Sequence, residues 1–354
     1  MSEQRRAPGR ASRRRFLKVC AALTGSTALP AWAEPARGMR HVEHGVLLGA
    51  EAEIQLYHPD ARAARAAIAE CFAEVGRLES VFSLEQPASA LSLLNRHGRL
   101  TDPPPELIAL VERAAEFSRA TSGAFDVTVQ PLWRLFVRHF AAHHADVNGP
   151  GVAAIQDARS RVDYRQVQVD RRRIALGRDG AAITLNGIAQ GFITDRIAEM
   201  LRARGFEHVL VNMGEMRALE GHVDGAPWRV GIADPDRPWH SFLTVPLVGQ
   251  AIATSGGYGT AFDASGRHHH LFDPRTGQSA NHYRSVSVLA PDATTADALS
   301  TGLSILPPDA ALAVLRAYPD ASALFLTNDG GLLQTGPTRF GQRPGARDAG
   351  AYRS

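Results

Sequence analysis

The order of strand-like and helix-like segments is the sequence feature that most restricts how this chain can fold. Residues 46–57 alternate between apolar and polar side chains like a strand, and apolar residues at helical spacing follow from about Asp60 to Phe82. Beyond them, strand-like and helix-like runs follow one another without the regular alternation that a doubly wound parallel sheet requires. The sequence therefore predicts an α+β fold with mixed sheets and packed helices. The 354 residues are enough for one large domain or two small ones.

Most of the expected strands lie in the second half of the chain. Ala182–Leu185 is predicted to form a strand that leads through a glycine-containing turn into a helix. A turn signature at Asn328-Asp329-Gly330 predicts a closing hairpin between two short strands. Further strands are expected at residues 209–213, 228–232, 242–247, 251–254 and 285–290.

The first 33 residues are typical of an export signal. Ser12–Lys18 matches the twin-arginine pattern, a weakly apolar stretch from Val19 to Leu29 follows, and Ala31-Trp32-Ala33 supplies a small-residue cleavage site. The alternative is a basic, disordered tail, but the three features occur in the order that a signal requires. We therefore expect twin-arginine export with cleavage near Ala33, a periplasmic location, a folded domain over residues 34–340 and a disordered tail over residues 341–354.

The charge of the chain gives no support for nucleic-acid binding. The formal net charge is +3, but residues 1–33 carry seven basic groups and one acidic group, so their removal leaves −3. Lys18, within the signal, is the only lysine. Phosphate binding by the mature protein must therefore use arginine, backbone N–H groups or a metal ion.

A carboxylate and a hydroxyl four residues apart, Asp297 and Thr301, form the most informative pair. They share one face of an expected helix whose other faces are apolar. Two hard oxygen ligands on a rigid face suit Mg²⁺, which is usually held by few protein groups together with substrate phosphates. The local alternative is a capping box, with Thr294 as the N-cap and Asp297 three residues later.

The turn Asn186–Gly191, between the expected strand and helix, could admit a ligand close to the backbone. Glycines permit that approach, and a helix N-terminus favours an anion. The segment is not the dinucleotide-binding glycine fingerprint. A glycine turn that only joins a strand to a helix is the competing interpretation.

Three other residues have both a functional and an ordinary interpretation. His270 could be a general base, because a neutral imidazole accepts a hydroxyl proton, or it could belong to a surface histidine cluster. Arg275 could hold a phosphate or pair with a nearby acid. Phe125, in a turn expected to lead into a strand, could stack on an aromatic ring or pack in the core.

Taken together, these segments resemble one known family, the FAD:protein FMN transferases, also called the flavin-trafficking or thiamine-biosynthesis-lipoprotein family. The resemblance extends over about Val46 to Leu333. Its specificity comes from several weak motifs in one order: Phe82-Ser83 through Ser89 to Asn95, Gly123–Leu132, Thr184–Asp195, Val211–Gly214, Ala253–Gly256, His270–Gly277 and Ala296–Thr301.

The resemblance implies a single flavin-transferase-type domain that binds FAD together with Mg²⁺. The metal ligands would be the Asp297 carboxylate, the Thr301 hydroxyl and the backbone carbonyl of Gly187. The residues implied to lie against FAD are Leu48, Glu85, Ala124, Phe125, Asp126, Thr184, Gln190 and Leu271.

The implied reaction is phosphoryl transfer, in which a Thr or Ser hydroxyl of a target protein attacks the FMN phosphate of FAD and AMP leaves. His270 is the candidate base for that hydroxyl. Two alternatives use the same site: a periplasmic FAD pyrophosphatase that gives FMN and AMP, and a non-catalytic FAD-binding carrier.

The sequence departs from the family pattern at several positions. Leu48-Gly49-Ala50 stands where Met-Gly-Thr is usual, and Glu85 replaces an aromatic residue. Thr184 and Gly257 each replace an aspartate. Glu215 replaces the second glycine of a Gly-Gly-Asp turn. The variant Asn212-Met213-Gly214-Glu215 also resembles the periplasmic branch that serves nitrous oxide reductase maturation. That branch would flavinylate a membrane-bound electron-transfer subunit.

Overall fold

A computed structural model describes residues 38–341 of the chain. The expected signal at residues 1–33 lies outside the described residues, as does nearly all of the expected tail at residues 341–354. The limits of the folded domain, expected at residues 34 and 340, therefore stay a prediction.

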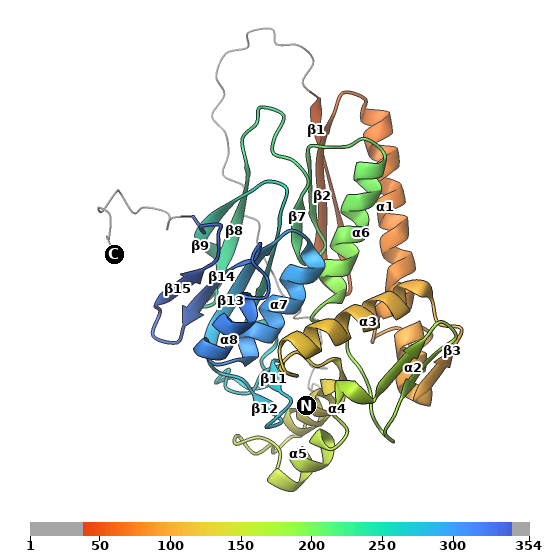
Figure 1. Cartoon of the computed structure of the whole chain (residues 1–354), viewed down its shortest axis with the longest axis vertical. Helices are drawn as coiled ribbons and strands as arrows, with labels where there is room; N and C mark the ends of the chain where they lie inside the picture. Colours follow the sequence, from red (N-terminus) through yellow and green to blue (C-terminus); the bar gives the residue numbers. More distant parts are fainter. Residues whose placement is uncertain (1–37, 342–354) are drawn as a thin grey trace, which may run out of the picture.

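One large antiparallel sheet forms the centre of the molecule (Figure 1). Its neighbouring strands are, in order, β1 (Met39–Leu47), β2 (Ala50–His58), β6 (Val209–Asn212), β7 (Met216–Ala218), β10 (Ala251–Ser255), β13 (Tyr283–Ala290), β14 (Ser322–Thr327) and β15 (Leu332–Thr335).

Helices cover one face of this sheet, with α1 (Ala61–Phe82), α6 (Ala189–Ala203) and α7 (Ala293–Ile305) side by side (Figure 1). The helix α3 (Pro105–Ala120) packs across α7. The short helix α8 (Pro308–Leu315) follows α7 in the chain. Alternate residues of the strands, such as Val211, Ala253 and Val288, join these helices in the main core.

A hairpin of two strands, β8 (Trp228–Asp234) and β9 (Arg237–Leu247), covers the other face. The intervening residues of the sheet strands, such as Leu210, Ile252 and Leu289, pack against it in a second core. The middle of the large sheet is therefore covered on both faces, which explains why most residues of its central strands are buried.

The smaller elements lie at one end of the sheet (Figure 1). The sheet of β3 (Arg99–Thr101), β5 (Arg173–Leu176) and β4 (Val167–Asp170) lies beside α2 (Ala90–His97). The helices α4 (Gln130–Phe140) and α5 (Val152–Arg159) pack together, and residues of the short strand β11 (Phe272–Asp273), which pairs with β12 (Gln278–Ser279), join them in a third, largely aromatic cluster.

The α+β prediction is confirmed, as is the closing hairpin, which is formed by β14 and β15. The single strand expected at residues 46–57 is wrong, because Leu48 and Gly49 turn the chain with positive φ angles of 46° and 83° and produce the β1–β2 hairpin. Ala182–Leu185 is not a strand either. Its backbone groups bond elsewhere: the Ile183 N–H donates to the Asn95 side chain and the Thr184 N–H to the Val127 carbonyl.

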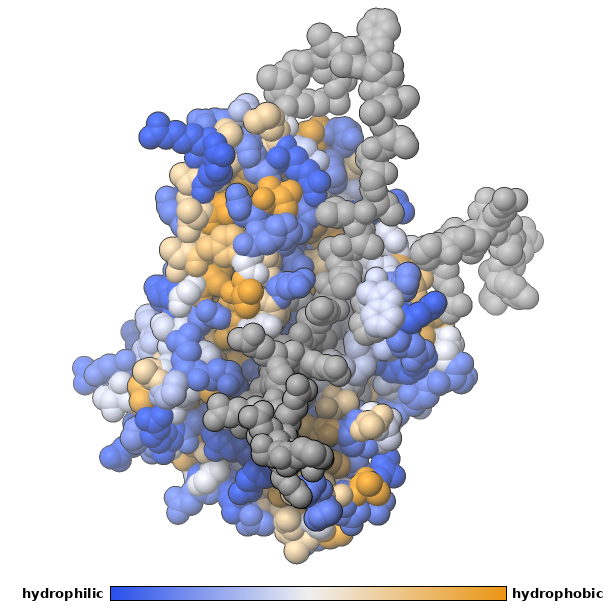
Figure 2. All heavy atoms as spheres, turned by 180° about the vertical axis from the view of Figure 1, so that it is seen from behind, coloured by the Kyte–Doolittle hydropathy of each residue, from blue (hydrophilic) through white to orange (hydrophobic). Residues whose placement is uncertain are grey.

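The surface seen from behind carries both kinds of side chain. Figure 2 shows hydrophilic side chains along its margins and apolar side chains gathered toward its upper middle. Such a mixture is ordinary, since apolar atoms provide more than half of a folded protein's surface. Within residues 38–341, none of the helices has the length and apolarity needed to cross a membrane.

Candidate active site

The helix α7 begins one residue after Asp292, whose carboxylate accepts a hydrogen bond of 2.7 Å from the Thr295 N–H. The capping box with Thr294 as N-cap is therefore wrong, because Thr294 already lies in the first turn. Asp297 is left without a capping role. Nearly every residue of α7 is buried, so a carboxylate on it needs a partner or a ligand.

Asp297 is buried, with 3% of its surface exposed, and it has a single donor among the described residues. The Gly191 N–H, at the start of α6, donates to its Oδ2 atom at 3.0 Å. Burial raises the pKa of the Asp297 carboxyl to about 7, and the negative charge of Asp195 adds to the effect. The ionised form is therefore unfavourable unless a positive charge binds nearby.

Two glycines allow the chain to approach Asp297 and Thr301 closely. A Cβ atom at Gly191 would lie 2.3 Å from the Ala293 carbonyl oxygen and 2.8 Å from the Asp297 Cβ. A Cβ atom at Gly187 would lie 2.9 Å from the Thr301 Oγ1. The backbone of Gly187 therefore lies directly against the Thr301 hydroxyl.

The Thr301 hydroxyl is oriented by β10. The Ser255 Oγ lies 3.2 Å from the Thr301 Oγ1 and 2.8 Å from the Ser300 Oγ. The half-buried Thr301 thus sits one helical turn after Asp297 and between Ser255 and Gly187. The three expected metal ligands come together in the fold.

The donor set at this place fits a hard divalent cation. It consists of carboxylate, hydroxyl and carbonyl oxygens, and the described residues provide no ion pair to Asp297. Three His, Cys, Asp or Glu side chains do not gather anywhere in residues 38–341, so a cation here would depend on the hydroxyl and carbonyl oxygens as well.

His270 presents a neutral imidazole at the edge of the aromatic cluster. Burial lowers its pKa to about 4, and the Nδ1 atom is buried without a hydrogen-bond partner among the described residues. The ring lies edge-on to Trp133. One ring nitrogen is therefore free to accept a proton, as a general base requires.

Part of the expected FAD-binding set gathers beside the Asp297–Thr301 pair. A Cβ atom at Gly302 would lie 3.3 Å from the Phe125 Cβ, so the turn holding Ala124 and Phe125 packs on α7 one residue after Thr301. The Thr184 N–H donates to the Val127 carbonyl, which joins that turn to the segment carrying Gly187. Gln190 follows on α6, and its side chain lies against Gly214.

The side chains of this turn serve the fold. Phe125 packs edge-on against Phe117 in the main core, so core packing is its observed role. Asp126 accepts hydrogen bonds from the Thr128 N–H and hydroxyl and from the Tyr164 N–H. The strand expected after the turn is wrong: a 3-10 turn, Val127–Val129, leads into α4. The role of this segment in binding FAD stays a prediction.

The remaining expected residues contact other parts of the fold. The Leu48 N–H donates to Glu79 near the end of α1, and the exposed Glu85 follows the same helix. Leu271 is buried next to His270, and its carbonyl accepts from the Ala280 N–H. Arg275 pairs with Asp273 through two hydrogen bonds, so its ordinary interpretation holds.

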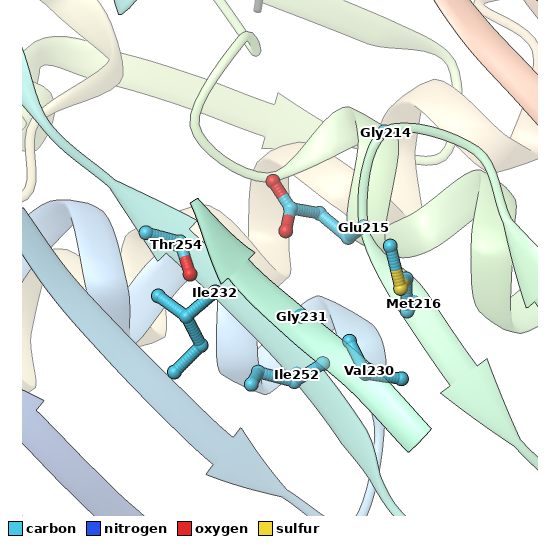
Figure 3. A pocket seen from close by; sticks show the side chains of 8 residues that line it. All are labelled: Gly214, Glu215, Met216, Val230, Gly231, Ile232, Ile252 and Thr254. Atoms are coloured by element: carbon cyan, nitrogen blue, oxygen red, sulfur yellow. The ribbon is translucent and has the colours of Figure 1, made fainter. Parts of the chain in front are cut away.

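Sequence reasoning missed Glu215 as a site residue and treated it only as a departure from a pattern. It lies between β6 and β7 with 7% of its surface exposed, and it lines a small pocket with Thr254 and Gly214 (Figure 3). Burial and the charge of Asp297 raise the pKa of its carboxyl well above the usual value. An acidic residue between two buried strands was the available signal.

A family model for the ApbE family matches residues 48–325, which is most of the chain and contains the whole group around Asp297. The chain belongs to the ApbE family. Two ApbE-type relatives named FAD:protein FMN transferase come from Treponema pallidum and Klebsiella pneumoniae. The first is 31% identical over 80% of this chain and 83% of its own length, and the second is 30% identical over 85% and 88%.

Solved ApbE structures have the same fold. The apo form of the flavinyl transferase ApbE from Pseudomonas stutzeri superposes with a TM-score of 0.72 at 26% identity, covering 84% of this chain and 94% of that one. The flavin transferase ApbE from Vibrio cholerae gives a TM-score of 0.70 at 26% identity, with 84% and 97% covered. The expected family and its single-domain α+β fold are confirmed.

Proposed function

We propose that this protein is an FAD:protein FMN transferase that moves FMN from FAD to a Thr or Ser hydroxyl of an acceptor protein and releases AMP. Relatives at about 30% identity over most of both chains carry this name. The observation that carries the proposal is Asp297, a buried carboxylate with one N–H donor, placed one turn from Thr301 and beside Gly187.

Mg²⁺ is the cation that we assign to these oxygens. When bound, it would neutralise charge on the pyrophosphate of FAD and favour in-line attack. The protein's own part is positioning. The Gly191 N–H fixes the Asp297 carboxylate, and Ser255 fixes the Thr301 hydroxyl. Because both ligands stand on one buried helix, little reorganisation is needed when charge develops.

His270 is our candidate for the group that accepts the proton of the attacking hydroxyl. Its lowered pKa keeps the imidazole neutral at physiological pH in the protein without FAD. The negative charge of bound FAD would raise that pKa toward the range in which a general base works best.

Location and acceptor are further parts of the proposal. The twin-arginine pattern and the cleavage site near Ala33 support export to the periplasm. The acceptor would then be an exported or membrane-bound electron-transfer protein. The resemblance of Asn212–Glu215 to the nitrous oxide reductase branch stays a prediction.

The test mixes mature protein, FAD, Mg²⁺ and a candidate acceptor fragment, with and without EDTA, and measures the acceptor mass. We expect a gain equal to FMN that EDTA abolishes, with AMP released in equal amount. Mg²⁺-dependent release of AMP and free FMN, with no gain by any of several Thr- or Ser-containing acceptors, would instead identify a pyrophosphatase. Bound FAD without any AMP would identify a carrier.

A further inference from the structure

Glu215 is a second buried acid near the Asp297–Thr301 pair. It occupies the turn from β6 to β7, and Figure 3 shows its carboxylate directed away from Met216 and toward the end of β10, where Thr254 lies. Thr254 lines the same small pocket as Glu215. A carboxylate that is more than nine-tenths buried is costly unless it has strong hydrogen-bond donors or a cation beside it.

The arginine nearest along the strand does not neutralise Glu215. Arg217 is bound to Asp195 at 2.9 Å and to Glu199 at 2.8 Å. Within residues 38–341, the ion pairs of the structure do not include Glu215 or Asp297. Both acids therefore lack a basic partner in the described part of the chain.

Glu215 is attached to the same elements that hold the expected metal ligands. Its carbonyl accepts a hydrogen bond of 3.1 Å from the Thr194 hydroxyl on α6, the helix whose first turn supplies the Gly191 N–H to Asp297. Thr254, which lines a small pocket together with Glu215, precedes Ser255, the partner of Thr301. Glu215, carried by the sheet, and Asp297, carried by a helix, thus both lie beside the candidate cation site.

The segments that carry the two carboxylates are in contact. A Cβ atom at Gly214, the residue before Glu215, would lie 2.3 Å from the Gln190 side chain, and Gln190 precedes Gly191, the N–H donor to Asp297. Two like charges in a buried site are unfavourable unless a cation lies between them. The affinity of an oxygen site for a divalent cation rises with the number of charged ligands.

We propose that Glu215 is a second carboxylate of the divalent-cation site, so that this protein binds the cation before FAD arrives. The inference rests on the proposed function for the place of the cation at Asp297, Thr301 and Gly187. A site with one carboxylate depends strongly on substrate phosphates to hold Mg²⁺, whereas a site with two holds it without them.

The test is calorimetric titration of Mg²⁺, and separately of Mn²⁺, into FAD-free mature protein. The variants are Glu215→Gln, Glu215→Asp and Asp297→Asn, with Glu220→Gln, an exposed acid after β7, as the control for losing one negative charge. We expect binding by the unchanged protein, at least tenfold weaker binding by Glu215→Gln, partial recovery in Glu215→Asp and no change in Glu220→Gln. Asp297→Asn should abolish binding.

The outcomes separate this inference from the proposed function. Unchanged affinity in Glu215→Gln, with binding lost in Asp297→Asn, overturns only the role of Glu215. Failure of the unchanged protein to bind a cation without FAD also overturns the role of Glu215. In that case the proposed function is tested only by the transfer assay. Binding that neither substitution weakens removes the metal assignment as well. Thermal unfolding in EDTA and in Mg²⁺ supplies a second readout, because Mg²⁺ should raise the melting temperature of Glu215→Gln less than that of the unchanged protein.

Discussion

Asp195, which is partly buried, and Asp297, which is buried, are two aspartates at the junction of α6 and α7, and their surroundings are opposite. Asp195 accepts hydrogen bonds from the Ala293 and Thr294 N–H groups, from the Thr294 hydroxyl and from Arg217. Asp297 accepts one, from the Gly191 N–H, and has no basic partner among the described residues. Burial raises the pKa of both carboxyl groups.

The difference supports our proposal that Asp297 serves a ligand, whereas Asp195 holds the fold. Asp195 binds the first N–H groups of α7 and thereby fixes the helix that carries Asp297. Asp126 is satisfied in a similar way by Thr128 and Tyr164. A buried carboxylate that the protein leaves almost unpartnered is costly, and a bound cation is the simplest compensation.

The strongest test of this contrast is the same substitution at each aspartate. We expect Asp297→Asn to lower FMN transfer by at least about 10²-fold, because the transition-state charge loses a fixed cation. Its free energy of unfolding in EDTA should stay the same or rise, since an uncompensated charge is removed. Single-turnover transfer and urea unfolding measure the two effects. Transfer at the unchanged rate would refute the metal assignment.

Asp195→Asn should show the reverse pattern. The free energy of unfolding should fall by about 3 kcal/mol, because the buried Arg217 loses an ionised partner and the new amide group faces N–H donors. Urea unfolding of this variant and of Asp297→Asn, measured side by side in EDTA, checks the expectation. Equal stability of the two variants would break the contrast between a structural and a functional acid.

The close approach of Gly187 to Thr301 offers a third test. Gly187→Ala should lower transfer by about tenfold or more, because its Cβ would lie 2.9 Å from the Thr301 Oγ1 and displace a ligand whose position matters. Gly76→Ala in α1 is the matched control, since its Cβ would meet nothing within 4 Å. It should leave transfer unchanged and raise stability by up to about 1 kcal/mol. If both variants transfer FMN equally well, Gly187 is not at the site.

A pH titration of stability without metal distinguishes the two acids further. The folded-state pKa of Asp297, about 7, exceeds the usual value of 3.8, so the folded protein holds the proton more tightly between those values. Stability therefore falls by on the order of 4 kcal/mol as pH rises from about 4 to about 7, and it is level above that. The fall should be smaller in Asp297→Asn and in Mg²⁺. A pH profile that neither change alters would show that Asp297 does not titrate in this range.

The smallest effect is expected at Arg275. Its pair with Asp273 is half-exposed, so Arg275→Ala should cost less than about 0.5 kcal/mol and leave the KM for FAD within about twofold. Urea unfolding and steady-state transfer check this. A large rise in KM would restore the phosphate-binding interpretation of Arg275 that the structure disfavours.

Much of the architecture followed from local sequence patterns. The period of apolar residues predicted α1, α3, α6 and most strands of the large sheet, because burial of one face imposes that period. The errors fell where the pattern and the backbone disagree. The period-two pattern of residues 46–57 continues through the turn at Leu48-Gly49, and the apolar run 182–185 is buried without joining a ladder.

Sequence by itself determined which groups make up the candidate site: an acid and a hydroxyl four residues apart on one helix face, and the glycines that admit a close approach. Tertiary structure alone decided which of the acids have hydrogen-bond donors and a basic partner and which do not. The donor to Asp297 lies 106 residues away, and the Thr294 donors to Asp195 lie 99 residues away. Hydrogen-bond satisfaction depends on such distant partners, so no local pattern could have separated Asp195 from Asp297 or placed Glu215 beside the latter.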